Sequence, residues 1–161
     1  MQHRMIAATF LLVALDLATT TARAQSVADV DHAIHAMELR MTALNTARKS
    51  LQQMEYHRDD HEAYAARDIS DADTTVFTAA VKVFTVGFIV TGMKCPDDLA
   101  FTRKQFGVVV DSFITTADAE LTLVNLNIRN VATPAALAEA TNIRDLIVDL
   151  RDFLKPFAAK G

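Results

Sequence analysis

Residues 27–51 read VADVDHAIHAMELRMTALNTARKSL, and this stretch decides the fold class. Its apolar residues recur at spacings of three and four, and only Arg48 interrupts them. They are Val27, Val30, Ile34, Met37, Met41, Leu44 and Leu51. Because residues at these spacings share one face of an α-helix, the stretch predicts an amphipathic helix that packs against other helices. Ser26 and Asp29 resemble a capping box at its start.

The same helical period returns twice further along the chain. One helix is predicted to begin at Pro96, since proline lacks an N–H that the first turn does not need. Its stripe is Phe106, Val110, Phe113, Ala117, Leu121, Val124 and Ile128. Another is predicted to begin at Thr133-Pro134 and to end near Pro156. Its stripe is Leu137, Ala140, Ile143, Ile147, Leu150, Leu154 and Phe157.

Residues 76–90 form a second predicted segment that is apolar on nearly all sides. A helix of this kind is buried either in protein or in lipid. Ser70 and Asp73 repeat the capping-box pattern just before it, so we expect this helix to start there. Lys82 lies near its middle and disfavours a membrane span. We therefore expect a buried core helix, with a dimer interface or membrane insertion as the alternatives.

The links between these segments predict how the helices are arranged. Short connections at 92–95 and 131–133 make consecutive helices antiparallel neighbours. The polar run at 57–62 ends the first apolar stripe, and we expect a break, a bend or an exposed overhang between Tyr56 and Ile69. The predicted fold is all-α, an up-down antiparallel four-helix bundle that occupies residues 25–161 as one domain.

The first 24 residues have the features of a cleaved signal peptide. Arg4 gives a basic start, residues 5–15 are apolar apart from Thr9, and Ala22-Arg23-Ala24 resembles a cleavage site. An apolar run of this length is too short to span a bilayer. The sequence therefore predicts residues 1–24 as a signal peptide and a periplasmic or secreted location. Cys95 is the only cysteine, so no intrachain disulfide is possible and we expect its thiol to be buried.

Composition excludes several classes of protein. The 161 residues are 51% hydrophobic with a net charge of −4, four glycines and three prolines, which excludes collagen-like and disordered chains. An acidic domain is a poor partner for nucleic acid, whose phosphates require a basic surface. Its net charge also argues against simple electrostatic adhesion to anionic lipid.

His57 and His61 are the best candidate metal ligands in the sequence. On a helix, residues four apart share a face, so both imidazoles can bind one metal ion. A stable site needs further ligands from another helix, and the alternative is a solvated polar face. Met37 and Met41 raise the possibility of Cu(I) ligation, but they lie on the apolar stripe, which favours core packing.

No catalytic motif is present: the sequence has no G-x-S-x-G elbow, no glycine-rich phosphate loop and no H-E-x-x-H. The sequence therefore predicts no enzyme and no cofactor. We expect an exported binding or structural-interaction module whose partner is a protein or a second copy of the chain, with its working surface at residues 56–69. The alternatives are a periplasmic metal-binding protein that uses His57 and His61, and a membrane-active helical protein.

Overall fold

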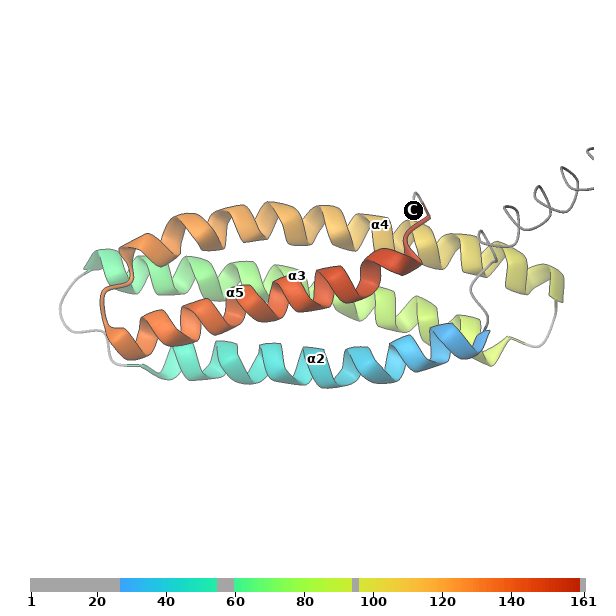
Figure 1. The fold of residues 1–161 in the computed structure, drawn as a ribbon, viewed down its shortest axis with the longest axis horizontal. Coiled ribbons are helices and arrows are strands. Elements are labelled where there is room, and N and C mark those ends of the chain that lie inside the picture. Colours follow the sequence, from blue (N-terminus) through green and yellow to red (C-terminus); the bar gives the residue numbers. More distant parts are fainter. Residues whose placement is uncertain (1–26, 55–59, 94–95, 160–161) are drawn as a thin grey trace, which may run out of the picture.

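The protein is a bundle of four long α-helices that lie side by side (Figure 1). This computed structural model describes residues 27–54, 60–93 and 96–159. The helices are α2 (Val27–Gln53), α3 (Asp60–Gly92), α4 (Pro96–Asn127) and α5 (Pro134–Leu154). Two 3₁₀ turns, η1 (Ile128–Asn130) and η2 (Lys155–Phe157), follow α4 and α5. The described residues contain no strand, which confirms the all-α prediction. The predicted signal peptide and Cys95 lie outside these residues.

The helices pack around one shared core, and α3 and α5 also contact each other across it. Helix α2 contacts α3 and α5, and α4 also contacts α3 and α5, with the most extensive contact between α3 and α4. The 33 residues of α3 give it a length of about 50 Å at a rise of about 1.5 Å per residue. The bundle is therefore long and narrow, and most of each helix surface outside the core faces solvent.

The stripes predicted for α2, α4 and α5 form most of this core. Met37 and Met41 are buried in α2, as core packing requires. The predicted residues of α4 are buried from Phe106 to Val124, and those of α5 from Ala140 to Leu154. Leu137 is the exception, because it is exposed in the first turn of α5 while Ala136 takes the buried position beside it. Burial of such side chains stabilises a fold by about 1.5–3 kcal/mol each.

Gly87 allows helix α3 to approach its neighbours closely. A Cβ atom at this position would clash with Ile34 Cδ1 and would lie 3.0 Å from Phe106 Cε2. Ile34 belongs to α2 and Phe106 to α4, and both side chains are buried. The glycine within the apolar run of α3 is thus explained by packing between three helices.

The start of α3 differs from the prediction. Helix α2 ends at Gln53 and α3 begins at Asp60, so the expected interruption lies earlier and is shorter than 56–69. Residues 60–69 are helical because Ala65, Ala66 and Ile69 continue the buried face of α3 toward its N-terminus. The capping box predicted at Ser70 and Asp73 is therefore wrong: both residues lie inside α3, and both are buried.

The prediction that residues 76–90 form a fully buried helix is also wrong for one face. Val76, Ala80, Val83 and Val90 enter the core, whereas the opposite side of α3 faces solvent. Within the described residues, α3 is the one helix long and apolar enough to cross a membrane, over His61–Gly92, and 28% of its most apolar window is buried. A core helix passes the same test, so this property alone does not assign a span.

Candidate functional site

The predicted histidine pair is only partly described by the structure. His57 lies outside the described residues, and His61 is exposed in the first turn of α3. Among the side chains that the structure describes, no group of three or more His, Cys, Asp or Glu residues is arranged to hold a metal ion. The metal site at His57 and His61 therefore stays a prediction.

Glu62, next to His61, has a defined structural role. Its carboxylate is buried, and Oε1 accepts hydrogen bonds from the backbone N–H groups of Ala132 at 3.0 Å and Thr133 at 2.6 Å. Oε2 accepts a third from the Thr133 hydroxyl at 3.0 Å. Thr133 is the N-cap of α5 and makes no capping bond to its own helix. Glu62 thus satisfies free N–H groups and places a negative charge near the positive end of α5.

We expect Glu62→Ala to lower the free energy of unfolding by about 1–3 kcal/mol, because the buried carboxylate and its three hydrogen bonds to Ala132 and Thr133 are lost. Chemical denaturation followed by circular dichroism measures the change. Glu38→Ala is the matched control, since Glu38 is exposed on α2 and its removal should change stability by less than about 0.5 kcal/mol. Equal effects of the two variants would contradict the role assigned to Glu62.

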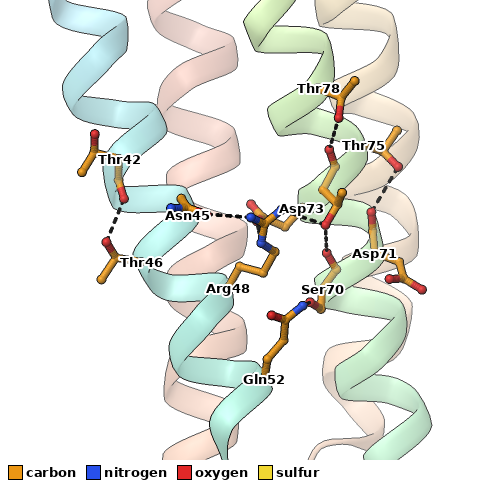
Figure 2. A network of polar contacts seen from close by, with 11 residues as sticks. Thr42, Asn45, Thr46, Arg48, Gln52, Ser70, Asp71, Asp73, Thr75 and Thr78 are labelled. Carbon is orange, nitrogen blue, oxygen red and sulfur yellow. Dashed lines mark hydrogen bonds and ion pairs between the residues drawn. The ribbon is translucent and has the colours of Figure 1, made fainter.

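A polar network crosses the seam between α2 and α3 (Figure 2). Arg48 of α2 donates to Asn45 Oδ1 at 2.6 Å and to Thr74 Oγ1 at 2.9 Å, and its Nε lies 3.8 Å from Asp73 Oδ2. One turn further along, Gln52 Nε2 donates to Ser70 Oγ at 2.6 Å. These contacts join the two helices at matched positions, and they set the register of α2 against α3.

Asp73 is the most unusual group of this network. Its side chain is fully buried, and neither carboxylate oxygen has a hydrogen-bond partner. Burial raises the pKa of Asp73 to about 7, and the positive charge of Arg48 opposes part of this rise. A buried carboxylate without hydrogen bonds is costly in its charged form. Asp73 therefore changes its charge close to neutral pH.

Two surface hollows lie along the same seam. One, of about 310 Å³, is lined by Glu38, Met41, Thr42, Asn45, Phe77 and Phe84. The other, of about 270 Å³, is lined by Leu51, Gln52, Ala63, Ala66, Arg67, Ser70 and Asp71. Neither of these two hollows is lined by Arg48 or Asp73.

A group of exposed apolar side chains lies on adjacent halves of α3 and α4. Val81, Phe88 and Ile89 of α3 are 40%, 66% and 49% exposed, and Phe101 and Val108 of α4 are 67% and 47% exposed. We call these five residues the α3–α4 apolar face. Within each helix, the positions seven residues apart (81 and 88, 101 and 108) lie two turns apart on one side.

The charged contacts of the bundle are concentrated on α5 and its neighbours. Arg40 of α2 pairs with Asp149 of α5 at 2.8 Å, and Arg151 of α5 pairs with Asp118 of α4 at 2.8 Å. Charged contacts thus gather around α5 and five exposed apolar side chains lie on the α3–α4 apolar face, while Leu39 of α2, Leu126 of α4 and Leu137 of α5 are exposed as well. Sequence reasoning missed the α3–α4 apolar face, although Phe101 and Val108 lie off the predicted stripe of α4 and could have indicated it.

The geometry of the bundle is the basis for assigning a function. Comparison of the chain with protein-family models, with curated proteins and with solved structures found no match.

Proposed function

We propose that this protein is an exported interaction module that binds its partner through the α3–α4 apolar face. In this proposal residues 1–24 are a cleaved signal peptide, the location is periplasmic or extracellular, and the helices form an up-down antiparallel bundle. The short connections at 93–95 and 131–133 support that topology, because they are too short to carry the chain back along the bundle.

The five exposed side chains of the α3–α4 apolar face are the observation that carries the proposal. Isolated exposed apolar residues are common on soluble proteins, but five of them on adjacent halves of two packed helices are typical of an interaction surface. Full burial of a phenylalanine side chain contributes about 1.5–3 kcal/mol, so Phe88 and Phe101 are expected to be main contributors to binding at this surface. This surface replaces the one expected at residues 56–69, where Glu62 has a structural role.

Site-specific photo-crosslinking tests the proposal in the producing cell. A photoreactive phenylalanine analogue is placed at position 88 or 101 of the α3–α4 apolar face, or at position 39 as the control. Leu39 is 75% exposed on α2 and lies outside the face. We expect covalent adducts from positions 88 and 101, detected by mass spectrometry, and none from position 39. Adducts in equal yield at all three positions, or at none, would contradict the proposed function.

A further inference from the structure

The chain around the α3–α4 apolar face has a charge opposite to that of the whole protein. Residues 74–110 contain four basic residues (Lys82, Lys94, Arg103 and Lys104) and two acidic ones, Asp97 and Asp98, in a chain with a net charge of −4. The side chains of Lys94, Asp97 and Asp98 are outside those that the structure describes, and the described charged side chains of this range are Lys82, Arg103 and Lys104. The nearest described carboxylates along the two helices are the buried Asp73 of α3 and the half-buried Asp111 of α4. This part of the surface is therefore both apolar and basic.

The exposed lysines lie beside the exposed apolar side chains. Lys82 follows Val81 directly, and Lys104 is three residues after Phe101 and four before Val108, which places it on the same side of α4. Both lysines are exposed. Phe88 and Ile89 are within about one turn of the end of α3, and Phe101 is in the second turn of α4. The apolar and the basic groups thus share the C-terminal half of α3 and the N-terminal half of α4.

Polar side chains on the outer side of α3 already have acceptors inside the helix. Thr78 Oγ1 donates to the carbonyl of Thr74, and Thr85 Oγ1 donates to the carbonyl of Val81, both at 2.8 Å. Thr91 Oγ1 donates to the carbonyl of Phe88 at 2.9 Å. Because these three hydroxyls are satisfied within the helix, they would not be unpaired donors in an apolar medium.

We propose that the partner of the α3–α4 apolar face is an anionic lipid bilayer. This inference rests on the proposed function and names the class of partner. Apolar side chains flanked by lysines, with few carboxylates between them, match the acyl boundary and the negative headgroups of such a membrane. The acidic residues of α2 and α5 oppose binding weakly, because charges are screened beyond about 8 Å at physiological ionic strength.

A second copy of the chain is a poorer fit to the same face. A symmetric dimer would place two surfaces of net positive charge against each other, because residues 74–110 have four basic residues and only two acidic ones, Asp97 and Asp98. Docking on lipid leaves the bundle intact, since the other side of α3 holds Val76, Ala80 and Val83 in the core. The net charge of the chain argued against binding to anionic lipid, because it sums the basic part of α3 and α4 with the acidic residues elsewhere.

Vesicle flotation of the purified exported protein tests the proposal. The probes are phosphatidylcholine vesicles with and without phosphatidylglycerol. We expect binding to the anionic vesicles, weakened by added salt. Each lysine contributes about fivefold to affinity at such a surface, so Lys82→Gln with Lys104→Gln should weaken binding by about 25-fold. Lys49→Gln, at an exposed lysine of α2, is the matched control and should leave binding unchanged.

A second pair of variants tests the apolar part of the surface. Phe88→Ser with Phe101→Ser should abolish vesicle binding, whereas Leu39→Ser should preserve it. Thermal melting by circular dichroism confirms that each variant is folded. Equal binding to neutral and anionic vesicles, or equal weakening by the control variants, overturns the proposal.

The crosslinking experiment separates this proposal from the more general one. Adducts to protein from position 88, together with a lack of vesicle binding, would overturn the lipid partner and leave the interaction module standing. If the protein forms a dimer in vesicle-free solution and Phe88→Ser disrupts that dimer, the partner is a second copy of the chain. This result would also overturn the lipid partner. The absence of any adduct from the α3–α4 apolar face would contradict the proposed function itself.

Discussion

Replacement of Asp73 by asparagine should stabilise the protein at about pH 8 by roughly 2–4 kcal/mol, although most substitutions of buried residues destabilise. Asp73 is fully buried without hydrogen bonds to its carboxylate, and burial raises its pKa to about 7. Above that pH the folded protein buries the negative charge of Asp73, whereas the unfolded chain exposes this charge to water. An amide of the same shape removes this charge, while Arg48 retains its hydrogen bonds to Asn45 and Thr74.

The same group gives the protein a pH dependence of defined sign. Because the pKa of Asp73 is higher in the folded state, the unfolded chain releases this proton first as the pH rises. The contribution of Asp73 is favourable at acid pH and is lost as the pH rises from about 4 to about 7. Asp73→Asn should remove this slope from a series of denaturant unfolding curves.

Asp71→Asn is the control for this prediction. Asp71 is exposed on the same helix, two residues away, and its long contact with Arg67 contributes little because solvent screens it. Its replacement should change stability by less than about 0.5 kcal/mol at every pH. If Asp73→Asn were less stable than the wild type at about pH 8 and the dependence of stability on pH were unchanged, the folded state would not suppress ionisation of the Asp73 carboxyl. That outcome would contradict the prediction.

Phe106→Ala should lower the free energy of unfolding by about 3–5 kcal/mol, the usual cost of a large cavity in a core. The Phe106 ring is buried on α4, meets the Phe157 ring edge-on with centroids 6.1 Å apart, and lies beside Gly87 of α3. Its removal leaves a space at the meeting point of three chain segments. Since Gly87 has no side chain, it cannot help to fill that space.

Phe101→Ala is the matched control, because it removes the same residue type from the same helix. Phe101 is 67% exposed, so its loss should change stability by less than about 0.5 kcal/mol. Denaturation in urea, with the midpoint and slope both fitted, measures the two variants under identical conditions. If the two substitutions cost the same, Phe106 does not occupy the core position described above.

The helices that could be predicted from sequence are those whose buried residues recur at spacings of three and four along the chain. The stripes of α2 and α4 fix their buried sides, and Pro96 and Thr133-Pro134 mark the starts of α4 and α5 correctly. These signals depend only on residues within one or two turns of each other. They therefore need no knowledge of the neighbouring helices.

The start of α3 could not be predicted because its decisive contacts are long-range. Ser70 and Asp73 have the spacing of a capping box, and the same residue types serve as buried partners when Gln52 and Arg48 of α2 lie opposite them. Local sequence does not distinguish a capping box at a helix start from buried polar residues inside a helix. The candidate surface was missed for a similar reason: the run at 76–90 is apolar all round, and only the packed bundle shows which side remains uncovered.

The bonds from Glu62 to Thr133 have a consequence for the order in which the protein folds. They join residues 71 apart in the chain, so their formation must overcome the closure entropy of a long loop. Such a contact becomes favourable only after α3 and α4 have paired and brought its ends together. The corner that leads into α5 is therefore completed late in refolding, and a nascent chain lacks this connection until nearly all of it has been synthesised.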